Sequence, residues 1–202
     1  FIITDTLVSK NIDNLIYLKD IKFPKYAEKI KDNKILNSKI TTFTSGTTSE
    51  PKKITRSYKI YKDASIDFVE HLALPQDKIK TIATFSGMYL GGVFNLFILP
   101  YVNGWDLIIP QKKGIFFWSN LAEYIKEYNL NLVWLTPGIV STLLKIKLDL
   151  STIDKGKLFF LSGTDYLSRN IWNEFRQNIK FPLLNTYGLS ETLFISAQIS
   201  EE

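Results

Sequence analysis

Short apolar runs alternate with longer amphipathic segments along the chain from Ile40 onwards. Short apolar strands are typical of a parallel sheet that is covered on both faces, and the longer segments between them are typical of the covering helices. The chain is therefore predicted to adopt an α/β fold, with a largely parallel sheet flanked by helices. The predicted strands span residues 40–43, 81–85, 106–109, 131–135, 157–161 and 183–187.

Helices are predicted over residues 57–72, 116–128 and 139–146. The second and third of these each carry an apolar face that should pack on the sheet. The two faces contain Leu121, Tyr124, Ile125 and Tyr128 in one case and Ile139, Leu143 and Leu144 in the other.

The sequence before residue 40 is lysine-rich and only weakly patterned, which is typical of a connection between domains. Residues 1–39 are therefore predicted to be a connecting segment or the end of a preceding subdomain. Residues 40–202 are predicted to form one α/β subdomain. With 202 residues, of which 45% are hydrophobic, the chain is long enough for one domain or most of one.

The most apolar stretch, residues 92–102, is interrupted by Asn95 and Pro100 and is shorter than the roughly 20 residues of a spanning helix, so no membrane span is predicted. No export-signal pattern follows Phe1. Cysteine is absent, which excludes disulfides and thiolate metal sites and fits a reducing compartment. A cytoplasmic location is expected.

The net charge is +5, but the basic residues are mostly lysines scattered among acids. This distribution favours a solvated surface over a nucleic-acid groove, so no nucleic-acid partner is predicted. The only histidine, His71, is expected to be a half-exposed residue of the helix over residues 57–72. A serine–histidine triad and a histidine-rich metal site are therefore excluded.

The segment TSGTTSEPK, residues 44–52, directly follows a predicted strand. Its hydroxyls and the backbone N–H groups around Gly46 can wrap phosphate oxygens, and Lys52 offers a mobile positive charge to a polyphosphate. It lacks the glycine spacing of the Walker loop and of the dinucleotide fingerprint. Taken alone, such a cluster of hydroxyls is more typical of an ordinary polar turn.

A second polar segment, NTYGLSET over residues 185–192, lies at the end of another predicted strand, where ligands of open α/β sheets collect. Tyr187 can lie flat against a purine, and Gly188 lets the backbone approach it. Ser190 can bond a phosphate oxygen, and Glu191 supplies the oxygen ligand that magnesium prefers.

Together the two segments resemble signature motifs of the adenylate-forming superfamily, which includes acyl-CoA synthetases, peptide-synthetase adenylation domains and luciferases. TSGTTSEPK resembles its phosphate loop, with Ser49 where glycine is usual. YGLSE resembles its adenine and magnesium motif, with Ser190 where threonine is usual. LSGTDYLS, residues 161–168, is similar to its glycine-rich adenine-binding turn, with Thr164 and Asp165 in place of small residues.

This resemblance covers about residues 40–192 and implies part of the large N-terminal domain of an adenylate-forming enzyme, without the C-terminal lysine-bearing domain. It implies ATP and Mg²⁺ as cofactors and a carboxylic acid as substrate, which is activated to an acyl-adenylate. It further implies catalytic roles for Lys52 and Glu191, with Glu191 as the metal ligand. The implied nucleotide-binding residues are Thr44, Ser45, Gly46, Thr47, Thr48, Ser49, Lys52, Gly163, Thr164, Asp165, Tyr187, Gly188 and Ser190.

Two questions stay open at this stage. Many acyl-CoA-forming members carry a histidine after a phenylalanine, whereas Phe85 is followed by Ser86 here, so the thiol acceptor is either coenzyme A, a carrier protein or another group. Met88, Tyr89 and Trp134 are either pocket or core residues. The 202 residues alone are expected to be inactive, and the alternative is a non-catalytic nucleotide-binding module.

Overall fold

A computed structural model describes residues 2–4, 15–17, 37–43, 52–74, 79–84, 89–110 and 114–198. The chain divides into two compact units, residues 1–36 and 37–202. In the first unit, strands β1 (Ile2–Thr4) and β2 (Leu15–Tyr17) pair in parallel. The assignment of residues 1–39 to a connecting segment stays a prediction.

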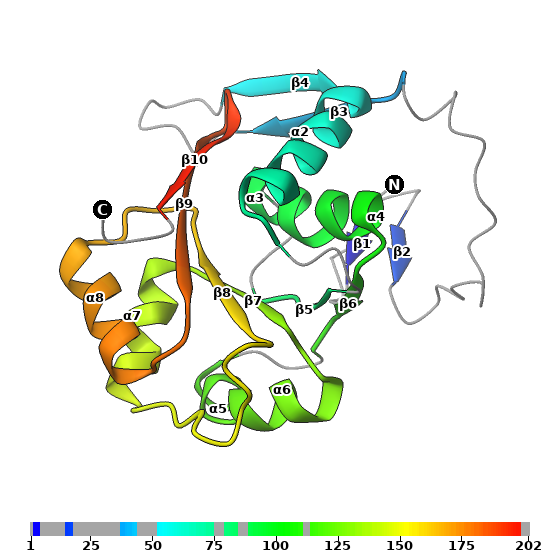
Figure 1. Cartoon of the computed structure of the whole chain (residues 1–202). Helices are drawn as coiled ribbons and strands as arrows, with labels where there is room; N and C mark the ends of the chain where they lie inside the picture. Colours follow the sequence, from blue (N-terminus) through cyan, green and yellow to red (C-terminus); the bar gives the residue numbers. More distant parts are fainter. Residues whose placement is uncertain are drawn as a thin grey trace. The chain divides into compact units, whose positions relative to one another are not determined.

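The second unit is built on a six-stranded sheet with the strand order β10-β9-β8-β7-β5-β6 (Figure 1). All neighbouring pairs are parallel except β9 and β10, which are antiparallel. The predicted α/β fold with a largely parallel sheet is therefore confirmed. The strands are β5 (Lys80–Ile82), β6 (Asp106–Ile108), β7 (Leu132–Leu135), β8 (Phe159–Ser162), β9 (Leu183–Leu189) and β10 (Leu193–Gln198).

The strand predicted over residues 40–43 exists but lies outside this sheet. It is β3 (Lys39–Phe43), which pairs antiparallel with β4 (Lys53–Ser57) in a separate two-stranded sheet. Only Thr42 of β3 is buried, so the strand is not covered on both faces as a central parallel strand would be.

Helices flank the sheet, and one predicted helix is divided in two. Residues 116–128 break at Asn120, whose backbone (φ −100°, ψ 13°) leaves the helical region and whose side-chain amide donates to the Phe116 carbonyl at 2.8 Å. Asparagine favours such local bonds over a continuous helix. The helices are α2 (Tyr58–His71), α3 (Leu90–Val93), the π-helix η2 (Phe94–Ile98), α4 (Leu99–Asn103), α5 (Ile115–Ser119), α6 (Leu121–Tyr128), α7 (Pro137–Lys145) and α8 (Arg169–Asn178).

The main core lies where α5 to α8 pack on the sheet. Leu121 of α6, Leu143 of α7 and Trp172 of α8 are buried against strand residues such as Phe160. The Trp172 indole N–H also donates to the Leu183 carbonyl at 2.7 Å. These contacts hold the first residues of β8 and β9 against the helices. Ligands of open α/β sheets bind at the opposite, carboxyl ends of the strands.

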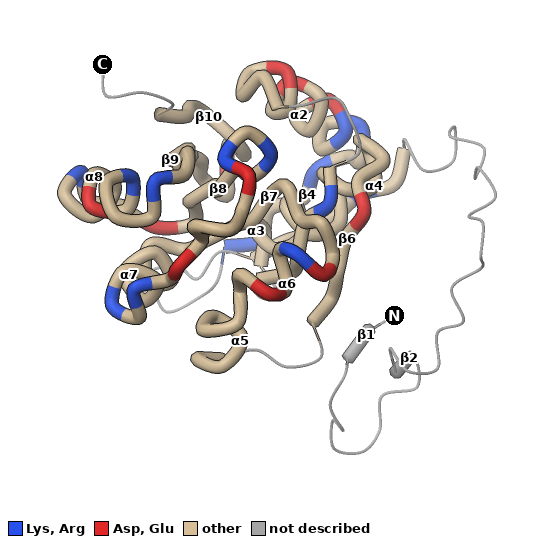
Figure 2. The backbone as a smooth tube through the Cα atoms, turned by 60° about the horizontal axis from the view of Figure 1, so that its bottom comes forward, with Lys and Arg blue, Asp and Glu red and all other residues tan. Residues whose placement is uncertain are grey.

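The described surface mixes charges of both signs. Figure 2 shows Lys and Arg interspersed with Asp and Glu along α2, α6 and α8, so none of these helices presents a surface of a single sign. Within the described ranges, no helix combines the length and the apolar character needed to cross a membrane.

Candidate functional site

The second polar motif forms the end of β9 and the turn into β10. Tyr187 and Gly188 lie in β9, and Ser190 and Glu191 lie in the turn, which is closed by a hydrogen bond from the Thr192 N–H to the Leu189 carbonyl at 3.1 Å. The turn therefore projects the Glu191 carboxylate beyond the ends of both strands.

Gly188 is required by the close approach of β10. A Cβ atom at this position would collide with the backbone carbonyl of Leu193. Because a backbone carbonyl in a paired strand cannot move aside as a side chain can, only glycine fits without separating the hairpin.

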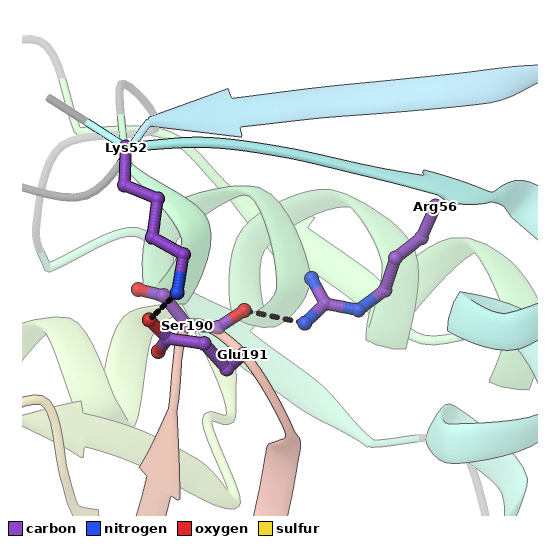
Figure 3. Close-up of polar contacts among 4 residues, drawn as sticks. All are labelled: Lys52, Arg56, Ser190 and Glu191. Carbon is purple, nitrogen blue, oxygen red and sulfur yellow. Dashed lines mark hydrogen bonds and ion pairs between the residues drawn. The ribbon is translucent and has the colours of Figure 1, made fainter.

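The structure brings the end of the first motif to the turn of the second. Lys52 Nζ donates to Glu191 Oε1 at 3.0 Å, although the two residues are 139 positions apart (Figure 3). Both side chains are substantially exposed, at 65% and 45%. The Lys52 ammonium, followed by the backbone N–H of Glu191, lowers the pKa of the Glu191 carboxyl below its ordinary value. Glu191 is therefore a carboxylate at neutral pH.

Arg56 makes a second link between β4 and the same turn. Its Nη2 donates to the Ser190 carbonyl at 2.6 Å (Figure 3). Sequence analysis did not identify this residue, because nothing in the motif marks a contact to a backbone atom of a distant segment. The alternation of residues 53–57 could have indicated a strand there, but not its partner.

The segment predicted as an adenine-binding turn follows β8. A Cβ atom at Gly163 would lie 2.6 Å from Thr186 Oγ1, which donates to the Ser162 carbonyl at 2.8 Å, so glycine lets β8 and β9 stay in contact. Thr164 has φ +76°, a left-handed conformation that is uncommon for a β-branched residue. Asp165 is exposed, and its Oδ1 accepts from the Tyr166 N–H at 2.7 Å.

A cavity of about 590 Å³ adjoins both turns. Gly163, Thr164, Tyr187, Gly188 and Ser190 line it, whereas Asp165 does not. The other lining residues are mostly apolar: Phe43, Phe68, Tyr89, Leu90, Gly91, Phe94, Asn95, Trp134, Thr186, Leu189, Leu193 and Phe194. A volume of this size is typical of small-molecule sites.

Tyr89 and Trp134, for which the sequence left pocket and core roles open, both line the cavity. Trp134 is also 2% exposed and stacks on Phe68 at 5.8 Å between ring centroids, so it serves the core and the cavity wall together. Burial raises the pKa of the Tyr89 phenol, an effect that a hydrogen bond with Thr164 partly offsets. The Tyr89 phenol is therefore neutral at physiological pH.

Several predicted residues lie outside the described residues. They are Thr44, Ser45, Gly46, Thr47, Thr48 and Ser49 of the first motif, and also Met88. Their nucleotide-binding and pocket roles stay predictions.

The described residues contain no cluster of three or more His, Cys, Asp or Glu side chains that could enclose a metal. Glu191 nevertheless fits magnesium, which is commonly held by one or two carboxylates and completed by substrate phosphates and water. His71 ends α2, is exposed and contacts the Phe194 ring, with 5.4 Å between ring centroids. It does not line the cavity.

A family model described as AMP-binding enzyme matches residues 18–202. No curated protein sequence matches significantly. Among solved structures, O-succinylbenzoate coenzyme A synthetase from Bacillus subtilis in complex with AMP is similar, with a TM-score of 0.66 and 18% identity over 81% of this chain and 33% of that one.

Two further solved structures are similar. ATP-bound MatB from Rhodopseudomonas palustris has a TM-score of 0.65 and 17% identity over 80% of this chain and 31% of that one. The luciferase-like enzyme of the nonluminescent mealworm Zophobas morio has a TM-score of 0.63 and 18% identity over 82% of this chain and 38% of that one. The chain thus spans about a third of the length of the structures it matches.

Proposed function

Because this chain belongs to the AMP-binding enzyme family, we propose that it carries the nucleotide-binding part of an enzyme that converts ATP and a carboxylic acid into an acyl-adenylate and pyrophosphate. The observation that carries this proposal is the contact between Lys52 and Glu191, which joins the two polar motifs beside one cavity. The binding of AMP and ATP by the similar structures supports it.

In the proposed reaction, a carboxylate oxygen of the acid attacks the α-phosphorus of ATP. The bond between that phosphorus and the oxygen bridging to the β-phosphorus breaks, and pyrophosphate leaves with the bond's electrons. The carboxylate is already ionised at neutral pH, so no general base is needed. The protein has to orient the two substrates and offset the charge that develops on pyrophosphate.

Lys52 is proposed to supply that charge. Its ammonium already lies at the turn, held 3.0 Å from Glu191, so little reorganisation is needed to bring it to a polyphosphate. The hydroxyls of Thr44, Ser45, Thr47, Thr48 and Ser49 are proposed to hold the β- and γ-phosphates, around Gly46.

Tyr187 offers an exposed ring, 56% accessible, for stacking of the adenine. Gly163, Thr164 and Gly188 are proposed to form the wall of that subsite, since they line the same cavity, and Asp165 to border it. Ser190 is proposed to contact a phosphate oxygen. These assignments place the base beside the sheet and the phosphates toward Lys52.

Glu191 is proposed to hold Mg²⁺ in the presence of the nucleotide. The ion would supply charge neutralisation at the phosphate oxygens. Glu191 contributes an ionised carboxylate, because Lys52 lowers its pKa, and the exposure of that carboxylate leaves room for phosphate and water ligands.

The later step is proposed to be transfer of the acyl group to a thiol, either of coenzyme A or of a carrier protein, in the cytoplasm. Coenzyme A ligases among the similar structures support coenzyme A. The alternative is a nucleotide-binding module without catalytic activity.

Pyrophosphate exchange into ATP distinguishes the proposed enzyme from a module without catalytic activity. It is measured on the full-length protein with a panel of carboxylic acids. The proposal requires acid-dependent exchange that falls by about 100-fold or more in Glu191→Gln, which keeps the size of the side chain but removes the negative charge that attracts magnesium. Glu174→Gln, at an exposed position of α8, is the matched control and should retain activity. ATP binding without exchange for any acid would favour the module.

A further inference from the structure

The cavity contains an aromatic wall that the nucleotide motifs do not supply. Phe68 of α2 is its centre, with ring centroids 4.8 Å from Phe194, 5.8 Å from Trp134 and 6.1 Å from Phe94. All four rings line the cavity. Edge and stacked contacts of this kind fix the rings, so the wall is rigid and apolar.

Asn95 is a polar residue beside this apolar, aromatic wall. It lines the cavity and is only 6% exposed as a residue, and its side chain makes no hydrogen bond with any residue that the structure describes. The amide atoms of Asn95 are not among the enclosed polar atoms that lack a partner, so they keep access to the cavity, where a ligand can supply hydrogen bonds.

The backbone at Asn95 is also unusual. Asn95 lies in the π-helix η2, where the Leu99 N–H donates to the Phe94 carbonyl, five residues earlier. Pro100 follows and has no N–H to donate to the Leu96 carbonyl, so the regular helical hydrogen-bond pattern is interrupted at this point. Turns of a π-helix are frequent at functional sites, because they redirect a side chain that a regular helix would place elsewhere.

The charge of the cavity limits what can bind beside Asn95. None of the described residues that line the cavity carries a charged side chain. A second carboxylate or an ammonium group would therefore be buried there without a counter-charge, which costs far more than burying a hydroxyl that is hydrogen-bonded.

We propose that the acid bound in this cavity has a flat apolar body and one uncharged hydrogen-bonding substituent, such as a hydroxyl or aromatic amino group, and that Asn95 binds that substituent. Asn95 is thus a specificity-determining residue. The inference rests on the proposed function, since it assigns the aromatic side of the cavity to the acid substrate.

Binding of substituted benzoic acids to the full-length protein, measured by calorimetry, tests the inference without any adenylation. The probes are benzoic acid, the three positional isomers each of hydroxy- and methylbenzoic acid, and terephthalic acid. At least one hydroxy isomer should bind roughly tenfold more tightly than the methyl isomer of the same position, as expected for one additional hydrogen bond. Terephthalic acid should bind more weakly than benzoic acid.

Asn95→Leu should remove the preference for hydroxyl over methyl and leave benzoic acid binding within about threefold. Asn178→Leu, at an exposed position of α8, is the control and should keep the preference. Asn95→Asp should instead bind 4-(aminomethyl)benzoic acid more tightly than the unmodified protein does. Misfolding cannot produce such a gain in affinity.

Equal affinities for hydroxy- and methylbenzoic acids, absence of binding by every probe, or an unchanged preference in Asn95→Leu would overturn the inference. Selective binding without pyrophosphate exchange would support the inference and contradict the proposed catalytic function. Acid-dependent pyrophosphate exchange in which the preference among acids does not depend on Asn95 would support the proposed catalytic function and contradict the inference.

Discussion

Arg56 holds the backbone of the β9–β10 turn, because its Nη2 donates to the Ser190 carbonyl at 2.6 Å. The next residue along the turn is Glu191, whose side chain meets Lys52. One cation thus fixes the main chain of the turn and the other meets its carboxylate. We infer that Arg56 is a positioning residue for Glu191.

Arg56→Gln should loosen the turn, since the charged donor to Ser190 is lost. A hydrogen bond from a charged group contributes about 1.5–3 kcal/mol, so a decrease of that size in the free energy of unfolding is expected. Amide hydrogen exchange at Thr192, whose N–H closes the turn, should accelerate. Exchange at α8 amides serves as the internal control, and equal acceleration there would contradict a local role.

Lys52→Ala should slow adenylation more than it weakens ATP binding, because the ammonium is most useful when pyrophosphate departs. A decrease in kcat of about 100-fold, with a change in the ATP dissociation constant of less than about tenfold, is expected. Steady-state pyrophosphate exchange and calorimetry on the full-length protein provide the two values. Lys155→Ala, at an exposed position, should change neither value. Loss of binding and of rate in equal proportion would contradict the assigned role.

The titration of Glu191 should depend on Lys52. The ordinary pKa of this carboxyl is 4.5, and the folded protein lowers it, so the contact with Lys52 contributes stability above pH 4.5 and loses it as the pH falls through the lowered value. In Lys52→Ala the pKa of Glu191 should rise toward 4.5. Carbon-13 NMR titration of labelled carboxyl groups measures this.

Asp149 and Asp154 provide reference groups within the same titration. Backbone N–H groups of Ser151 and Gly156 lower their pKa values, and neither contact involves Lys52. Their pKa values should therefore stay lowered in Lys52→Ala. A Glu191 pKa at or above 4.5 in the unmodified protein would contradict the ion pair.

Gly188→Ala should separate β9 from β10, because the added methyl group meets the Leu193 carbonyl. A cost of about 1–3 kcal/mol in unfolding free energy is expected from such overpacking. Gly138→Ala in α7 is the matched control, since the nearest atom lies 3.9 Å away and alanine favours a helix. Gly138→Ala should be neutral or slightly stabilising. Chemical denaturation measures both variants, and equal stabilities would refute the close approach.

The central strands β5, β7 and β8 were predictable from sequence because they are short, mostly apolar and largely buried. Residues 183–187 were predicted as a strand, yet β9 continues to Leu189 and turns into β10. The continuation could not be read, because residues 188–192 carry the polar types that also form loops. The hairpin that positions Glu191 is therefore identified only in the three-dimensional structure.

Site residues were predictable where the residue type in a local motif indicates the chemistry. They were not predictable where a side chain contacts the backbone of a distant segment. The candidates Tyr187, Gly188 and Glu191 are identifiable from a local motif. Arg56 is not, because its partner is a carbonyl 134 residues away. Asn95 lies in an apolar stretch in which no residue pattern indicates a π-helix.

The separation of 139 positions between Lys52 and Glu191 also determines when the site can form during protein synthesis. At about 5–20 residues per second, the ribosome adds Glu191 roughly 7 to 28 s after Lys52. Throughout that interval the nascent chain carries the lysine and lacks its carboxylate partner. The paired site can therefore exist only after β9 and its turn have left the ribosome, so its appearance reports that the chain has folded at least as far as this turn.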